Sequence, residues 1–246
     1  MNDPSGPITF LAALVLVLSL TTPISASPAT DDVPDLSGTW SVDYQTTAVT
    51  AIPIVRDFHT ITRARLVADI DQDGKSLGIT TRVCQLDLDS DMRVARPVAP
   101  RAFGESLSET RRRGELVKNN DDWELRIHPV WETVGVQLDD PSEGKLPTES
   151  DDPRVIDQDR DGNPGSTILV RGALDAEIYV TQRSWDRWQG RIVDEDTIQG
   201  TLRWHTEQSI VGASHRILRR QPEATPHPDP AKNIFRMNRA ADTPPC

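Results

Sequence analysis

The chain has 246 residues and a formal net charge of −11, because 38 Asp and Glu side chains outnumber 27 Lys and Arg side chains. A surface of this sign repels phosphate backbones, so we expect no nucleic-acid partner. The same charge suits cations and favours solubility.

The first 26 residues resemble a removable export signal. An unbroken apolar run covers residues 8–20, which is too short to cross a bilayer as a helix, and Ser25 and Ala26 supply small residues for cleavage. The segment before the run lacks Lys and Arg, so a buried N-terminal helix stays as the alternative. No other stretch is apolar enough to span a membrane. We therefore expect a secreted or periplasmic protein in which residues 27–34 form a flexible lead.

Alternating apolar and polar residues fill most of residues 35–220 and predict β-strands. The clearest pattern runs from Trp188 to His205 and is interrupted by a polar turn at residues 194–196, which predicts a β-hairpin. Residues 107–117 allow one short helix. The number of strand patterns fits one all-β domain, either a single antiparallel β-barrel or a β-sandwich.

Residues 221–246 are expected to form a proline-rich tail. Four prolines between residues 222 and 230 rule out a regular strand or helix there, although residues 234–237 could add a short strand. The chain has two cysteines, Cys84 and Cys246. In an oxidising compartment they are expected to pair and to tie the tail to an internal strand, with two free thiols as the alternative.

The pattern D-x-D-x-D-G occurs twice, ending at Gly74 and at Gly162. Two carboxylates about 5 Å apart repel each other by roughly 1–3 kcal/mol in a partly screened setting, so three favour a cation between them. Hard oxygen ligands with flexible geometry favour Ca²⁺ over Mg²⁺. The predicted ligands are Asp69, Asp71 and Asp73 in the first copy, and Asp157, Asp159, Asp161 and Asn163 in the second.

Both copies resemble the front half of an EF-hand loop and other DxDxDG calcium loops of exported proteins. Position 12 is Thr80 in the first copy and Ile168 in the second, where an EF-hand needs a bidentate Glu. Glu177, or the acidic run at residues 87–91, could supply a missing ligand. The alternative is a pair of hairpin turns with solvated aspartates. Bound calcium would have weak, roughly submillimolar affinity and would stiffen the loop.

Residues 38–40 read Gly-Thr-Trp at the start of the first predicted strand, which resembles the lipocalin and wider calycin pattern. The resemblance implies a β-barrel closed at one end by Trp40, with an Arg from the last strand packed over its ring. The candidates for this partner are Arg216, Arg219 and Arg220. A barrel of this kind could enclose a small apolar ligand.

No catalytic motif is present: the chain lacks G-x-S-x-G, H-E-x-x-H and C-x-x-C. Residues 111–113 are three consecutive arginines and are expected to form a solvated charge run. The first hypothesis is an exported, calcium-stabilised β protein that binds a small ligand or a protein partner without catalysis. The alternatives are a secreted hydrolase whose site is assembled from distant strands, and a structural module of the cell envelope.

Overall fold

The computed structural model describes residues 33–52, 56–120, 122–173, 175–219, 223–240 and 246. The expected signal at residues 1–26 and all but the end of the expected lead lie outside the described residues. No helix in the described ranges is long and apolar enough to cross a membrane.

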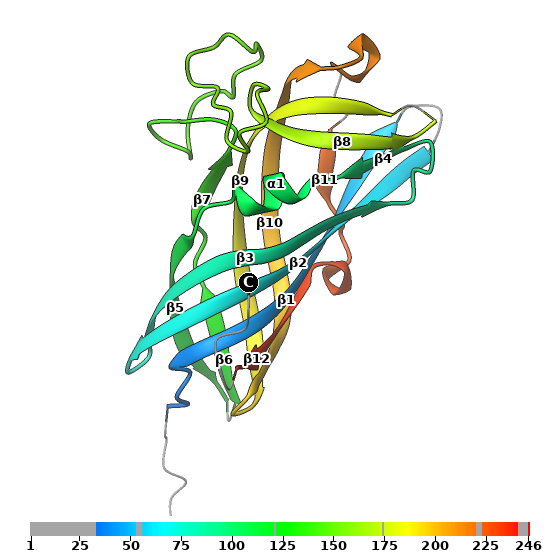
Figure 1. The fold of residues 1–246 in the computed structure, drawn as a ribbon. Helices are drawn as coiled ribbons and strands as arrows, with labels where there is room; N and C mark the ends of the chain where they lie inside the picture. The colour runs from blue at the N-terminus through cyan, green and yellow to red at the C-terminus, as the bar shows by residue number, and fades with distance from the viewer. Residues whose placement is uncertain (1–32, 53–55, 121, 174, 220–222, 241–245) are drawn as a thin grey trace, which may run out of the picture. The chain divides into compact units, whose positions relative to one another are not determined.

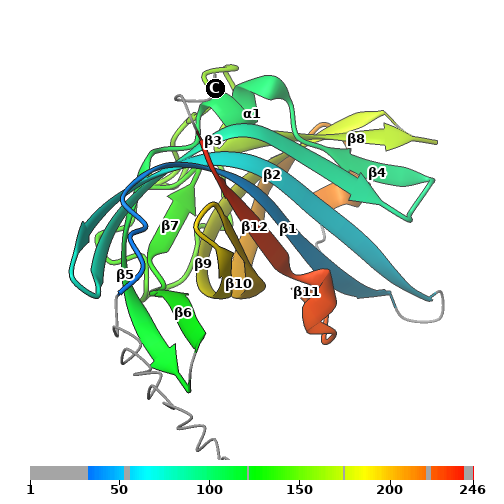
Figure 2. The same ribbon diagram turned by 90° about the horizontal axis from the view of Figure 1, so that it is seen from below.

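The described residues form an all-β structure, and twelve strands belong to one antiparallel sheet. Eight of these strands close into a ring in the order β10-β12-β1-β2-β3-β5-β6-β9, because β9 pairs again with β10 (Figures 1 and 2). The all-β prediction is confirmed, and the ring is compatible with both a barrel and a sandwich. The ring strands are β1 (Gly38–Ile52), β2 (Arg56–Asp73), β3 (Ser76–Ser90), β5 (Thr110–Asn119), β6 (Asp122–Ile127), β9 (Ala176–Asp194), β10 (Thr197–Ala213) and β12 (Ile234–Arg239).

The remaining strands extend this ring. β8 pairs with β9 and β4 pairs with β8, whereas β7 pairs with β9 and β11 with β1. A short helix lies between β4 and β5 in the sequence, and two 3-10 turns flank β11. The bounds are β4 (Ala95–Val98), α1 (Arg101–Glu105), β7 (Trp131–Val134), β8 (Ser166–Gly172), η1 (Arg216–Arg219), β11 (Ala224–Pro226) and η2 (Pro230–Lys232).

The predicted hairpin at residues 188–205 is confirmed as part of β9 and β10. The two strands pair Trp188 with Leu202 and join through a turn at Glu195 and Asp196. Polar turn residues between two alternating runs were therefore sufficient to locate this element.

The predicted short helix at residues 107–117 is wrong, because β5 occupies most of that segment. Along β5, Arg112, Gly114 and Leu116 share one face while Arg111 and Arg113 share the other, which is the two-residue period of a strand. The helix that does form is α1, a few residues earlier.

The segment expected as a tail completes the ring. β12 lies between β10 and β1, so the β domain extends to Arg239, beyond the expected end at residue 220. The short strand predicted at residues 234–237 is confirmed. β11 adds a second strand within the proline-rich segment, where none was expected.

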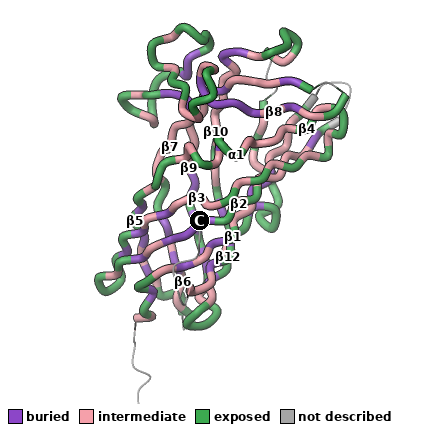
Figure 3. Tube along the Cα trace, viewed as in Figure 1, coloured by how far each residue is buried: buried purple, intermediate pink, exposed green. Residues whose placement is uncertain are grey.

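The two halves of the ring differ in how tightly they pack. One half holds the main core, in which Trp40, Ile198 and Met237 are fully buried. Figure 3 shows buried residues gathered in this lower half of the ring. Along the inward face of β1, the large side chains of Trp40 and Val42 give way to the small Ala48 toward the other half. This change in side-chain size leaves space inside the ring.

Trp40 and Arg239 close the packed end of the ring. The two residues are register partners on β1 and β12, and the Arg239 guanidinium lies 4.5 Å from the centroid of the Trp40 ring. Arg239 also donates hydrogen bonds of 2.7 Å to the backbone carbonyls of Ser37 and Asp35. This contact combines a cation–π interaction with anchoring of the chain that enters β1.

The lipocalin resemblance predicted such an arginine on the last strand, but the residues named for it were wrong. Arg216 and Arg219 lie in η1, which follows β10, and Arg220 lies outside the described residues. The partner is Arg239, because β12 and not the end of β10 runs beside the start of β1.

Candidate functional site

A cavity of about 950 Å³ lies inside the loosely packed half of the ring. This volume is at the upper end of the range typical of ligand pockets. Small side chains face each other across the β1–β2 pair, where Thr46 opposes Thr62 and Ala48 opposes Thr60. The lining also includes aliphatic and aromatic residues from several elements: Leu86, Leu88, Phe103, Ile168, Ile178, Trp131, Trp185, Trp188 and Trp204.

The outer elements contribute part of the cavity wall. Phe103 of α1 and Ile168 of β8 are buried together with Val180 of β9, in a cluster separate from the main core. Leu107, after α1, packs against the same cluster. The segments that branch from the ring therefore cover the cavity with apolar side chains.

A buried charge cluster forms the polar part of the cavity wall. The Arg112 side chain is only 4% exposed, and it donates from Nη1 to Asp186 Oδ1 and from Nη2 to Glu132 Oε2, the latter at 3.0 Å. Tyr44 donates to Asp186 Oδ2 at 3.1 Å, and Thr110 donates to Glu132 Oε1. Four strands, β1, β5, β7 and β9, therefore meet at one guanidinium.

The cluster changes the ionisation of its members. Burial raises the pKa of Glu132, although the adjacent Arg112 opposes this shift. Burial raises the pKa of Tyr44 well above its usual value, and the neighbouring Asp186 adds to the effect. Burial lowers the pKa of Arg112, but Asp186 and Glu132 outweigh it, so the net pKa is raised and the guanidinium stays charged.

The cavity wall is acidic overall. Two carboxylates face one guanidinium in the buried cluster, which leaves one negative charge when Glu132 is ionised. The charged lining residues are Glu109, Glu132, Asp186, Glu207 and Glu223 on the acidic side, and Arg111 and Arg112 on the basic side.

The charge cluster was not foreseen, and the expectation for Arg112 was wrong. The three arginines at 111–113 were expected in solvent, yet Arg112 is buried between its exposed neighbours. The signal was the two-residue period itself: on a strand, three consecutive side chains cannot all face the same side. Arg112 shares its face with the buried Leu116, which places it inside the ring.

The second aspartate pattern forms a compact acidic loop, which we define as residues 157–163, before β8 begins. One carboxylate oxygen each from Asp157, Asp159 and Asp161 lies within 4.8 Å of the others. Oxygens around a calcium ion lie about 2.3–2.6 Å from it, so this spacing fits a shared cation. The loop leads into β8 from irregular chain and does not connect two strands as a hairpin would.

Hydrogen bonds preform the acidic loop. Asp157 accepts from the backbone amides of Asp161 and Gly162 at 3.1 and 3.0 Å, and Asp161 accepts from the Asn163 amide at 2.9 Å. Asp159 Oδ2 accepts from the backbone amide of Thr167 at 2.8 Å, which fixes the loop to β8. These bonds hold the three side chains on the same side of the turn.

Asp159 is the most enclosed of the three carboxylates. Its Oδ1 atom is buried and has no hydrogen-bond partner in the part of the chain that the structure describes. Burial raises the pKa of Asp159, and the charges of Asp161 and Asp157 add to this. Desolvation by burial acts to raise the pKa of Asp161, but hydrogen bonds, including those from Asn163, outweigh it and the pKa is lowered.

Two other predicted ligands lie outside this group. Asn163 directs its side-chain amide toward Asp161, with Nδ2 donating to Oδ2 at 3.2 Å. Glu177 accepts from the Tyr179 hydroxyl at 3.1 Å and does not belong to the three-residue group.

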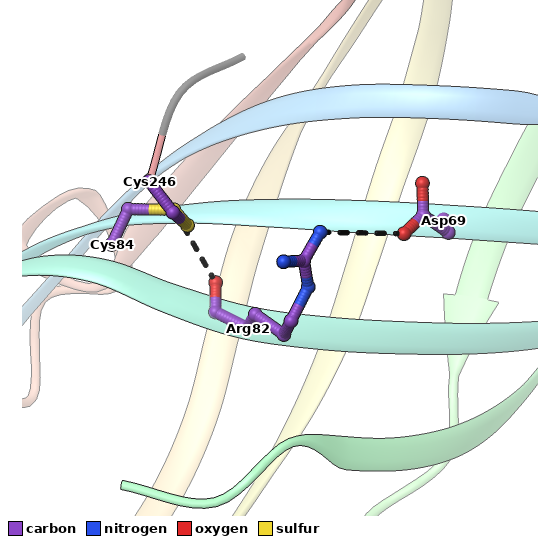
Figure 4. Close-up of a disulfide and its surroundings, with 4 residues drawn as sticks. All are labelled: Asp69, Arg82, Cys84 and Cys246. Atoms are coloured by element: carbon purple, nitrogen blue, oxygen red, sulfur yellow. Dashed lines mark hydrogen bonds and ion pairs between the residues drawn. A yellow bond between two sulfur atoms is a disulfide. The ribbon is translucent and has the colours of Figure 1, made fainter. Parts of the chain in front are cut away.

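The structure does not bring together the first aspartate pattern. Asp69, Asp71 and Asp73 lie along β2, each paired with a residue of β3, and alternate residues of a strand are about 6.5–7 Å apart. Asp69 accepts from the Thr39 hydroxyl at 2.7 Å and lies 3.8 Å from Arg82 (Figure 4). Among the described residues, the only group with suitable spacing for a metal is the one in the acidic loop.

Cys84 and Cys246 form a disulfide, as expected (Figure 4). Their Cα atoms are 4.5 Å apart and their sequence separation is 162 residues. The bridge attaches the last residue of the chain to β3.

Comparison of the chain with protein-family models, with curated proteins and with solved structures finds no match. Function therefore has to be inferred from the cavity, the buried charge cluster and the acidic loop.

Proposed function

We propose that this is an exported protein that binds a small, largely apolar molecule inside its ring of strands, and that calcium stiffens its acidic loop. The observation that carries the proposal is the cavity of about 950 Å³ in a ring whose other half is tightly packed. A structural module of the cell envelope would be expected to fill both halves of its core.

The composition of the cavity wall supports ligand binding. Aliphatic and aromatic side chains make up about half of the lining residues, and several of the polar ones converge at the buried charge cluster. Ligand sites typically combine an apolar wall with a small number of placed polar groups that orient the ligand. The wall is built on strands, which hold side chains more firmly than loops do.

Export is supported by the disulfide. Disulfides persist in oxidising compartments and are uncommon in the reducing cytosol. The bridge between Cys84 and Cys246 therefore favours a secreted or periplasmic location.

Calcium binding is supported by the spacing of the acidic loop together with the unpartnered Oδ1 of Asp159. Buried carboxylate oxygens normally have a partner, and a hard divalent cation suits three carboxylates. The second copy of the pattern is the proposed site. Its role is mechanical, because the loop leads directly into β8, which lines part of the cavity through Ile168.

A hydrolase is the second candidate, because the cavity holds two carboxylates, Glu132 and Asp186, close to one guanidinium. Arg112 occupies an oxygen of each carboxylate, and Thr110 and Tyr44 occupy the others. An acid–base pair needs at least one carboxylate free to exchange a proton with a substrate. The hydrogen-bonding pattern therefore favours binding over catalysis.

The test is binding of a neutral apolar fluorophore, N-phenyl-1-naphthylamine, to the purified protein. We expect saturable binding of one molecule per chain. Ala48→Trp adds a large side chain to the cavity wall and should weaken binding at least about tenfold, because it occupies ligand space. Val49→Trp is the matched control, since Val49 is the adjacent residue on β1 and does not line the cavity.

Absence of saturable binding, or equal weakening by both substitutions, would contradict a ligand site in the cavity. To test the hydrolase alternative, small esters are incubated with the protein, and their hydrolysis is measured. Turnover that Glu132→Gln abolishes would replace the binding proposal with catalysis.

A further inference from the structure

In the buried charge cluster every carboxylate oxygen has at least one hydrogen bond, whereas two neighbouring donors have none. All four carboxylate oxygens of Asp186 and Glu132 already accept a hydrogen bond, from Arg112, Tyr44 or Thr110. Every oxygen has at least one donor, so the groups here that lack any hydrogen-bond partner are donors and not acceptors.

Two buried donors have no hydrogen-bond partner among the described residues. These are Arg112 Nε and Trp188 Nε1, on residues that are 6% and 2% exposed and that both line the cavity. The two side chains are adjacent, with the Arg112 guanidinium 5.8 Å from the centroid of the Trp188 ring. A buried donor without an acceptor costs about 1–3 kcal/mol, and a ligand oxygen that reaches either atom would offset this cost.

The charge of the wall decides which oxygen is suitable. The buried cluster carries two carboxylates against one guanidinium. Among the other charged lining residues, Glu207 pairs with Arg183 and Glu109 with Arg111, so the net negative charge of the wall comes from the cluster and Glu223. A carboxylate or phosphate head group would be repelled by this negative wall. An ammonium head group has no acceptor for the two unpartnered donors, and it would face the positive charge of Arg112.

We propose, resting on the proposed ligand site, that the cavity selects molecules with an apolar body and one uncharged oxygen, an alcohol or a ketone, which accepts a hydrogen bond from Arg112 Nε or Trp188 Nε1. The apolar body would lie along the threonine and aliphatic wall of β1, β2 and β3. The charge cluster then acts as a filter on the ligand head group: it favours a ligand with an uncharged oxygen and disfavours a ligand with a charged head group.

The test uses four ligands that differ only in their head group: 1-decanol, 2-decanone, decanoate and decylammonium. Each displaces N-phenyl-1-naphthylamine from the wild-type protein at neutral pH. We expect the alcohol and the ketone to bind at least about tenfold more tightly than either ion, which is the range for a hydrogen bond to a charged donor.

Three variants separate the filter from general packing. Glu132→Gln removes one negative charge and keeps the side-chain shape, so the affinity for decanoate should rise at least about tenfold relative to the affinity for the neutral ligands. Arg112→Lys keeps the charge and removes Nε, so it should reduce the preference for neutral oxygen. Leu88→Val, an apolar part of the wall, is the control and should change all four ligands alike.

Tightest binding of an ion, or affinities within about threefold of one another for all four ligands, would overturn the filter. If the fluorophore binds but no member of the series displaces it, the filter is also overturned, although the proposed ligand site remains supported. If the fluorophore does not bind, the ligand site and the filter both fail. Because Arg112 is buried, circular dichroism establishes whether the Arg112→Lys variant folds. If that variant does not fold, the wild-type ligand series and Glu132→Gln still test the filter.

Discussion

Asp159 is the residue on which the calcium proposal depends. One of its oxygens fixes the loop to β8 through Thr167, and the other is buried without a partner near Asp157 and Asp161. Replacing this side chain therefore has two separable effects: it removes a backbone anchor and it removes a calcium ligand.

A thermal melt in calcium, in magnesium and in chelator separates these effects. If the dissociation constant is about 0.5 mM, about 10 mM calcium contributes about 2 kcal/mol and raises Tm by roughly 4–8 °C. Asp159→Ala should lower Tm in chelator, because the Thr167 amide loses its acceptor, and it should abolish the increase with calcium. Asp151→Ala, at an exposed aspartate earlier in the same irregular region, should keep the full increase.

Equal melting temperatures in all three solutions would remove the calcium site. An equal response to magnesium would show that the loop is not selective, which contradicts the preference argued from flexible oxygen ligands.

At the scale of elements, the β9–β10 hairpin depends on a pair of glycines. Gly190 and Gly200 face each other across the two strands, and Gly200 is also the register partner of Phe235 on β12. A Cβ on Gly200 would lie 2.1 Å from the Gln189 carbonyl oxygen and 2.6 Å from Phe235 Cε1. The glycine pair therefore lets the Phe235 ring approach the backbone, where it packs against Trp188 with the ring centroids 5.0 Å apart.

We expect Gly200→Ala to destabilise the protein by roughly 2–4 kcal/mol, because overpacking here is against backbone and not only against a mobile side chain. Gly78→Ala is the matched control: it also lies in a ring strand, and its added Cβ would be 3.8 Å from its nearest neighbour, the Asp71 carbonyl oxygen. The control should change stability by less than about 1 kcal/mol. Urea unfolding followed by tryptophan fluorescence measures both, and similar losses for the two variants would refute the packing argument.

At the scale of the whole molecule, the C-terminal segment contributes to closing the sheet. β12 joins β10 to β1, and the disulfide then attaches Cys246 to β3. A bridge that spans 162 residues restricts the unfolded chain over most of its length. In the chain-entropy model such a restriction contributes about 4–5 kcal/mol.

Reduction of the bridge should therefore lower Tm by roughly 5–15 °C, allowing for the smaller effects usually measured. The double variant Cys84→Ser, Cys246→Ser should melt near the reduced wild type and should not respond to dithiothreitol. Calorimetry with and without the reductant measures this. A wild-type Tm that is unchanged by full reduction would show that the bridge adds nothing to the stability of the ring.

The sequence by itself determined the features that depend on neighbouring residues. Alternation along Thr197–His205, the polar turn before it and the dense aspartates of the acidic loop are local, because a strand turns each side chain over at every step and glycine allows sharp bends. The same alternation could also have placed Arg112 inside the ring. The cysteine pair was expected because two thiols tend to pair in an oxidising compartment, and not because of where they lie in the sequence.

Only the tertiary structure decided which strands lie side by side. Trp40 meets Arg239 because β12 pairs with β1, and Arg112 meets Asp186 and Glu132 because strands distant in sequence surround one cavity. Side-chain period is a property of a single strand, whereas pairing order is set by the free energy of the complete sheet. For that reason, the sequence shows which residues face inward, and only the closed ring shows what they face.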